Sequence, residues 1–285
     1  MADPMAAPEF ITDMEPDAEG VPKPATTVFL IGKECPFRCL MCDLWKNTVE
    51  TPSPPGALIA QLQSILPQIQ HRHTIKLYNA SNFFDPQAVP RSERNELARL
   101  VKEFELVVVE NHPKLMSSQV VEFASQLSGQ LQVAMGLETA DETILAWLNK
   151  QMTLRDYDRA CGFLLENGIS IRTFILLPAP GVKGDEVVAH TVASVRHALD
   201  CGSHVTSLIP LRAGNGIMDW LMDQNVVQLP TLNLVADTFA ASIKLPRKKE
   251  QRVLLDLWNL AALAGEGVDP VSICNQLEQM NLKQA

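Results

Sequence analysis

Three closely spaced cysteines, Cys35, Cys39 and Cys42, are the residues of this chain with the clearest chemical potential. They stand in the run GKECPFRCLMCDLW, directly after an apolar stretch. Closely spaced thiolates bind iron–sulfur clusters, and a cluster held only by protein needs a fourth cysteine nearby. The next cysteine in the chain is Cys161. The triplet therefore predicts a cluster with three protein ligands and one iron that is open to a small ligand.

Zinc and disulfide interpretations of the triplet are weaker. A structural zinc ion takes four ligands, and the nearest additional candidates, His71 and His73, lie beyond a proline-rich stretch. A disulfide would leave one thiol over, and the sequence has no mark of secretion. Cys161 and Cys201 stand in helical patterns, where cysteine usually acts as a small buried apolar residue.

Length and composition are typical of an enzyme with one large core. The chain has 285 residues, of which 46% are hydrophobic, and this is within the range of a single α/β barrel. Residues 1–24 are acidic and rich in Pro and Ala, which predicts a flexible tail and no signal peptide. No stretch has the apolar length of a membrane helix, so we expect a cytoplasmic protein. A net charge of -9 argues against broad binding to a phosphate backbone.

Short β-rich runs alternate with longer amphipathic stretches, which predicts parallel βα units. We expect six strands, which is fewer than a full eight-stranded barrel requires. These strands are expected at residues 26–32, 74–79, 105–110, 131–136, 170–177 and 204–211. The expected organisation is a barrel core over residues 25–215 and a helical C-terminal extension over residues 216–285.

The carboxyl ends of parallel barrel strands converge on one mouth, and residues that suit a site follow the predicted strands. A single Asn or Ser in a loop more often hydrogen-bonds within a turn than binds a ligand, but the six strand ends together favour a site. They carry the cysteines after the first strand, Asn79, Ser81 and Asn82 after the second, Glu110 and His112 after the third, Glu138 after the fourth, the PAPG turn after the fifth, and Arg212 and Asn215 after the sixth.

Two carboxylates at these ends need partners. Glu110 and Glu138 follow apolar strands, where a buried charge requires hydrogen-bond donors from a ligand or from a framework cation. Arg172 lies on the fifth strand and either points into the barrel as a ligand or acts as a buried counterion. His112 is first a loop residue and second a candidate proton donor.

The spacing of the cysteines resembles the signature of the radical S-adenosylmethionine (radical SAM) enzymes. The segments CLMCDLW, KLYNASNFFD, VENHP, GLET and NKQMT are together most similar to the archaeosine-lyase-type members, in the branch of the elongator acetyltransferase and the tRNA methylthiotransferases. The resemblance implies a partial (βα)6 TIM barrel, a 4Fe-4S cluster on the three cysteines, SAM on the open iron, and an electron donor such as flavodoxin or ferredoxin. In that family, SAM then yields a 5′-deoxyadenosyl radical.

The resemblance also implies site roles and leaves the reaction class open. A GGE-like motif for the SAM amino group is absent, so Asn79, Ser81 or Asn82 would replace it, and Met41 stands where many members have an aromatic residue. The residues expected to bind SAM are Met41, Asn79, Ser81, Asn82, Glu138, Arg172, Arg212 and Asn215, and the expected catalytic residues are Glu110 and His112.

The substrate and even the enzymatic role have alternatives. We expect a small or modified-base substrate first and tRNA as the alternative. The basic run KLPRKKEQR, residues 244–252, is expected after the last strand, where it would flank the barrel mouth, although a solvated face is its more ordinary explanation. The non-enzymatic alternative is an iron–sulfur sensor or an inactive scaffold.

Overall fold

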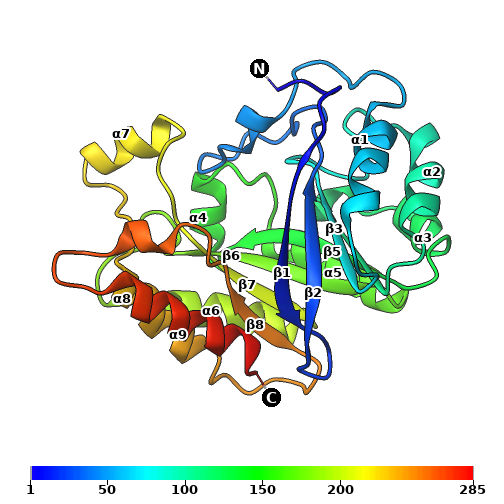
Figure 1. The fold of residues 1–285 in the computed structure, drawn as a ribbon. Coiled ribbons are helices and arrows are strands. Elements are labelled where there is room, and N and C mark those ends of the chain that lie inside the picture. The colour runs from blue at the N-terminus through cyan, green and yellow to red at the C-terminus, as the bar shows by residue number, and fades with distance from the viewer. Residues whose placement is uncertain (1, 285) are drawn as a thin grey trace.

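The computed structural model describes residues 2–284. The fold is built around a curled eight-stranded sheet (Figure 1). Its spatial order follows the chain, from β1 to β8. The strands are β1 (Glu9–Pro16), β2 (Pro22–Phe29), β3 (Thr74–Tyr78), β4 (Leu106–Glu110), β5 (Gln130–Glu138), β6 (Ser170–Leu177), β7 (Val205–Pro210) and β8 (Arg252–Leu255). Only the β1–β2 pair is antiparallel. The prediction of an α/β partial barrel is confirmed.

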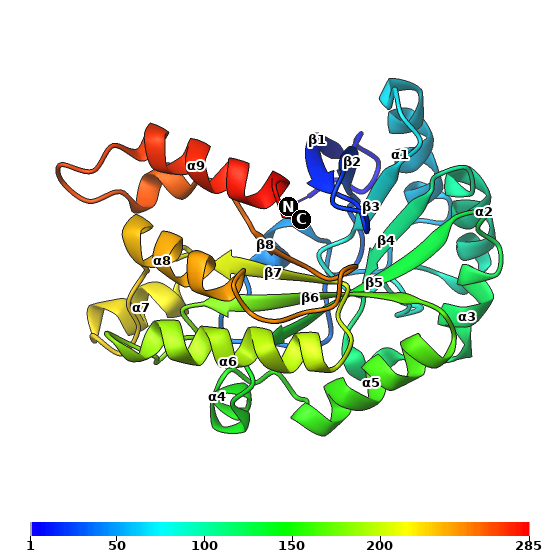
Figure 2. The same cartoon turned by 90° about the horizontal axis from the view of Figure 1, so that it is seen from below.

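The convex outer face of the sheet is covered by α1 (Ala57–Ile65), α2 (Arg91–Val101), α3 (Ser118–Ala124), α5 (Leu154–Glu166), α6 (Glu186–Asp200) and α8 (Leu232–Ser242) (Figure 2). Helix α9 (Pro270–Leu282) packs against the edge strands β1 and β8. The remaining helices, α4 (Glu142–Trp147) and α7 (Ile217–Asp223), belong to the segments that follow β5 and β7. Short 3-10 turns add η1 (Leu44–Asn47), η2 (Leu66–Gln68), η3 (Pro113–Leu115) and η4 (Leu260–Leu263). None of the helices within residues 2–284 has the length and apolar character that crossing a membrane would need.

The apolar strand residues form the core between sheet and helices. On β4, Val107, Val108 and Val109 are all fully buried, as expected for a parallel strand that is covered on both faces. Helix α5 begins at a capping box, in which Thr153 and Asp156 satisfy each other's backbone N–H groups. This capping box fixes where α5 starts, and hence where the segment that follows β5 ends.

The six predicted strands correspond to β2 through β7, but two further strands were not predicted. Residues Glu9–Pro16, expected within a flexible tail, form β1 and pair with β2 along their whole length. That part of the tail prediction is wrong, while residue 1 lies outside the described part of the chain. Most of β1 is exposed, so its sequence lacks the apolar run of a buried strand. The other addition, β8, comes from the expected helical extension, whose last residue, 285, also lies outside the described range.

A buried ion cluster joins β1 to the inside of the barrel. Glu15 on β1 pairs with Lys76 on β3 and with Arg172 on β6, whose Nη2 atom lies 2.7 Å from Oε2. Arg172 also donates from Nε to Gln132 at 2.9 Å. Burial by itself opposes ionisation of Glu15, but the two cations hold its pKa far below the usual range. The Arg172 guanidinium thus serves as the counterion of Glu15 in the amino-terminal half of the strands, which is the alternative to its expected role in SAM binding.

The basic run, residues 244–252, lies at the end of the barrel that is opposite to the expected mouth. It forms the connection from α8 to β8 and therefore meets the amino-terminal end of a parallel strand. In Figure 1 this orange loop is at the bottom, whereas the blue segment between β2 and α1 is at the top. The expectation that the run flanks the mouth is wrong, because β8 was missing from the predicted strands.

Candidate cluster and cofactor site

The three cysteines lie in the loop between β2 and η1, at the carboxyl end of the first parallel strand. All three are partly buried free thiols. The loop turns back on itself through a hydrogen bond from the Cys42 N–H to the Cys39 carbonyl, at 3.1 Å. Burial raises the pKa of each thiol, and the Lys150 ammonium acts against this shift at each of them. Bound iron would supply the positive charge that stabilises the thiolates.

Segments that follow other strands hold this loop in place. The Asn215 amide donates to the Leu40 carbonyl at 2.8 Å, and the Asn149 amide donates to the Arg38 carbonyl at 2.8 Å. Phe37 stacks on His112 with a ring-centroid distance of 3.8 Å. The loop that bears the cysteines is therefore braced from three directions. Asn215, expected to bind SAM, uses its side chain for this bracing and also accepts from the Met218 N–H.

Lys150 is a buried cation beside the cysteines that was not among the expected site residues. Its ammonium lies 2.6 Å from Oε1 of Glu138. Burial opposes the charge, but Glu138 and the nearby cysteines raise the Lys150 pKa. The only sequence signal was its place in the run NKQMT. Lys150 pairs with one oxygen of Glu138. It is therefore the framework cation that was the alternative to a ligand as the partner of this carboxylate.

The backbone around Glu138 is adapted to this ion pair. Glu138 has a φ of 67°, and the β5–β6 register shifts between Gly136 and Glu138. A Cβ atom at Gly136 would lie 2.1 Å from the Glu138 carboxylate and 2.6 Å from the Lys150 ammonium. A side chain at position 136 would therefore displace the ion pair from its present position.

Polar groups without partners lie next to the cysteine loop, after β3. Both amide atoms of Asn79 and the hydroxyl of Ser81 are buried and have no hydrogen-bond partner. Asn82, from the same segment, donates to the Cys35 sulfur at 3.1 Å and accepts from the His112 N–H at 2.7 Å. Buried polar groups without a partner are costly. These residues therefore fit a polar ligand such as SAM, and Asn82 instead positions Cys35.

Glu110 and His112, the two expected catalytic residues, occupy different environments. Burial raises the pKa of Glu110 to about 7, against the opposing effect of the Asn79 and Ala80 N–H groups. His112 accepts at Nδ1 from the Lys114 N–H at 3.2 Å, and its Nε2 lies 3.0 Å from the Lys150 carbonyl. Burial and the Lys150 charge lower the His112 pKa to about 3. Both His112 nitrogens are used in the framework, so its geometry supports the loop role rather than proton donation.

The other expected SAM ligands lie around the rim. Met41 packs against the apolar cluster that contains Leu148 and Met218. Arg212 pairs with Asp256 and lies over the Trp258 ring, with its guanidinium carbon 4.7 Å from the ring centroid. Arg212 is thus held by the segment that follows β8.

We compared the sequence of this chain with family models and with curated proteins. No family model matches the chain. An uncharacterised protein of Methanocaldococcus jannaschii is 20% identical over 206 residues, which are 68% of this chain and 56% of that protein. The chain thus spans a little over half the length of this curated relative.

Solved structures resemble this chain more extensively. Methylornithine synthase (PylB) aligns with a TM-score of 0.57 and 15% identity, over 91% of this chain and 82% of that one. Elp3 of Methanocaldococcus infernus aligns with a TM-score of 0.55 and 11% identity, over 80% of this chain and 58% of that one. A radical SAM methyltransferase of Sphaerobacter thermophilus aligns with a TM-score of 0.54 and 15% identity, over 94% of this chain and 77% of that one. The chain therefore shares the partial-barrel fold of these three proteins.

Proposed function

We propose that this chain is a radical SAM enzyme in which Cys35, Cys39 and Cys42 hold a 4Fe-4S cluster and the open iron binds SAM. The observation that carries the proposal is the position of the triplet, in the loop after the first parallel strand of this fold and beside the unpartnered Asn79 and Ser81. When bound, the reduced cluster and SAM would supply a 5′-deoxyadenosyl radical that takes a hydrogen atom from the substrate. An external electron donor such as flavodoxin or ferredoxin is part of the proposal.

The protein's own contribution would be to position these groups and to exclude water. Asn79 and Ser81 offer donors and acceptors to the polar groups of SAM, while Asn82 and Lys150 hold the cysteine side of the site. Glu110 is partly buried and its pKa is raised to about 7, so it can either accept or donate a proton. Partly buried Leu40 and Met41 cover one flank with apolar surface.

For the substrate, we propose a small molecule or a modified base. Inside the sheet, Tyr78 and Phe174 meet edge to face, with a centroid distance of 6.2 Å, beside Glu110 on the neighbouring strand. The sequence similarity to archaeosine-lyase-type proteins supports a nucleobase. A tRNA carrier is the less favoured alternative, since the basic run lies away from the mouth. Salt-dependent binding of tRNA by the reconstituted, SAM-loaded protein would favour that carrier.

Anaerobic reconstitution followed by reduction with dithionite tests the proposal directly. The protein should release 5′-deoxyadenosine from SAM slowly, even without substrate, as chromatography of the products would show. A protein that holds the cluster but never consumes SAM would instead be a sensor or a scaffold.

Replacement of Asn79 by Ala should weaken SAM binding roughly 5- to 150-fold, the range for leaving a buried polar partner unsatisfied. Because neither amide atom has a protein partner, the same change should leave the thermal stability measured without SAM and the cluster spectrum nearly unchanged. Equilibrium binding of SAM and thermal unfolding measure the two effects. Asn95→Ala, on the exposed surface of α2, is the matched control. Unchanged SAM affinity in the Asn79 variant would remove this residue from the proposed site.

A further inference from the structure

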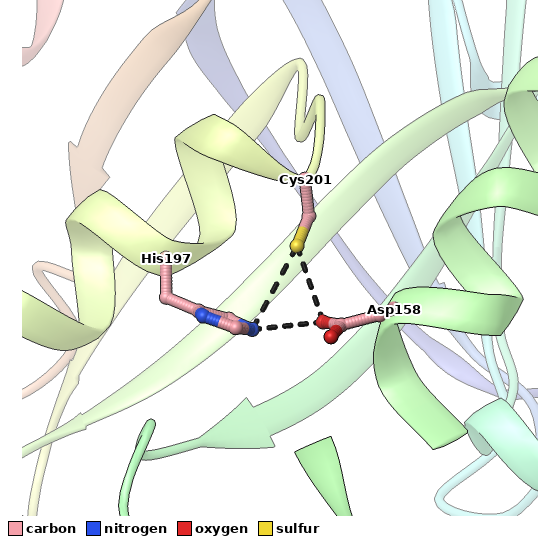
Figure 3. A group of neighbouring side chains, drawn as sticks. All are labelled: Asp158, His197 and Cys201. Atoms are coloured by element: carbon pink, nitrogen blue, oxygen red, sulfur yellow. Dashed lines mark hydrogen bonds and ion pairs between the residues drawn. The ribbon is translucent and has the colours of Figure 1, made fainter. Parts of the chain in front are cut away.

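A second group of ligand-type side chains lies between helices α5 and α6. Asp158 projects from α5, and His197 and Cys201 project from the end of α6 toward it (Figure 3). The Asp158 Oδ1 atom lies 2.9 Å from His197 Nε2 and 3.2 Å from the Cys201 sulfur, which is 3.7 Å from His197 Nε2. One oxygen, one nitrogen and one sulfur thus face a common point.

The sequence spacing explains why these atoms converge. His197 and Cys201 are four residues apart and so share one face of α6. Asp158 and Cys161 are three residues apart on α5, and the Cys161 thiol neighbours Cys201. Cys161 is buried, whereas Cys201 and His197 are partly exposed. The two neighbouring crossover helices therefore present ligand-type residues to each other, and the open side faces solvent.

We propose that Asp158, His197 and Cys201 bind a zinc ion that joins α5 to α6, with its fourth position open to water. Zinc accepts this mixed set of oxygen, nitrogen and sulfur ligands in tetrahedral geometry. From standard zinc–ligand lengths, the edges of such a site measure about 3.3–3.6 Å. The three distances here, 2.9, 3.2 and 3.7 Å, require shifts of only a few tenths of an ångström.

A nucleophilic Cys-His-Asp triad does not fit the same atoms. In a triad, the acid contacts one imidazole nitrogen and the nucleophile contacts the other. Here, Asp158 and Cys201 both approach Nε2 of His197, and they also contact each other. This closed triangle suits ligands that share one ion and does not suit relay of a proton through the ring.

The site is separate from the cysteine loop. His197 and Cys201 lie at the carboxyl end of α6, immediately before β7 begins at Val205. They are therefore close to the amino-terminal end of the strands, while the triplet follows the carboxyl end of β2. Zinc binding at this site does not depend on the proposed radical chemistry.

Titration with Co²⁺, a spectroscopic substitute for zinc, tests the site. Full-length protein with Cys35, Cys39 and Cys42 all replaced by Ala excludes binding at the triplet. This protein should bind one Co²⁺ per chain with visible bands of tetrahedral coordination and a near-ultraviolet thiolate band. Cys201→Ala in that background should lose the thiolate band and the stoichiometric binding, and His197→Ala should lose the binding. Cys274→Ala, on α9, should retain both. Circular dichroism verifies the fold of each protein.

A second measurement covers the case in which the multiple variant fails to fold. Zinc added to the anaerobically reconstituted parent, whose triplet is occupied, should raise its thermal midpoint, and Cys201→Ala should abolish that rise. Absence of stoichiometric Co²⁺ binding by the folded triple variant would overturn the proposal. Bands that persist in the Cys201 variant, or a thermal rise that survives in it, would also overturn it.

Discussion

Replacement of Cys39 by Ala should abolish both iron binding and formation of 5′-deoxyadenosine. With Cys35 and Cys42 alone, the loop retains two of the three thiolates that the proposed cluster needs, so a stable cluster should not form. Parent protein reconstituted with iron and sulfide under anaerobic conditions should hold about four irons and be brown. The variant should be colourless and nearly free of iron. Iron analysis, the visible spectrum and SAM cleavage measure the change.

Cys274→Ala is the matched control for this result, because Cys274 lies on α9 and not in the cysteine loop. It should retain iron, colour and cleavage at the level of the parent. Stoichiometric zinc in parent protein purified without air, together with no uptake of iron, would contradict the cluster. A Cys39 variant that keeps its brown colour would show that this thiol is not a ligand.

Replacement of Glu15 by Gln should lower the free energy of unfolding by about 3–5 kcal/mol, the usual effect of removing one partner from a buried ion pair. Gln keeps the size of the side chain but leaves Lys76 and Arg172 buried without their carboxylate. Urea denaturation measures the loss. Glu9→Gln changes an exposed carboxylate on the same strand and should have an effect within about 0.5 kcal/mol. A loss below about 1 kcal/mol for the Glu15 variant would mean that the buried ion pairs of Glu15 with Lys76 and Arg172 do not stabilise the fold.

The same carboxylate gives a signed dependence on pH. Its pKa is depressed in the folded protein, so its contribution is present above the unfolded value of about 4.3 and declines as pH falls below it. The difference in stability between parent and Glu15→Gln should therefore narrow on acidification. Urea titrations at neutral and acidic pH would reveal the trend, and a difference that widens toward low pH would contradict it.

The strands that could be predicted are those with strong local signals. Strands β2 through β7 are apolar runs with amphipathic crossovers, so their periodicity is sufficient to locate them. By contrast, β1 and β8 gain their structure from pairing with neighbours. In β1, most side chains face solvent, and β8 has only four residues. The missing β8 also reversed the expected position of the basic run, since the same loop precedes one strand instead of following the last one.

The site was partly predictable for a related reason. Cys35, Cys39 and Cys42 are recognisable by spacing alone, and polar strand ends placed Asn79 and Glu138 at the correct end of the barrel. Lys150 was missed as a member because its proximity to the cysteines depends on the left-handed turn around Asn149 and Gln151. The choice between the two roles considered for Arg172 could not be made from the sequence because its partner, Glu15, is far away in sequence. Residue type and strand alternation alone do not indicate which of two ligands a buried cation faces.

The contact between Glu15 and Arg172 spans 157 positions of the chain, which has a consequence for the order of synthesis. The amino-terminal strand leaves the ribosome long before β6 exists, and domains generally fold as units during translation. Until then, Glu15 has one of its two cationic partners at most and must remain hydrated. The polar surface that makes the β1 sequence resemble a flexible tail thus suits a segment that stays exposed to solvent until β6 has been synthesised. The inner ion cluster can be completed only after more than half of the protein has been made.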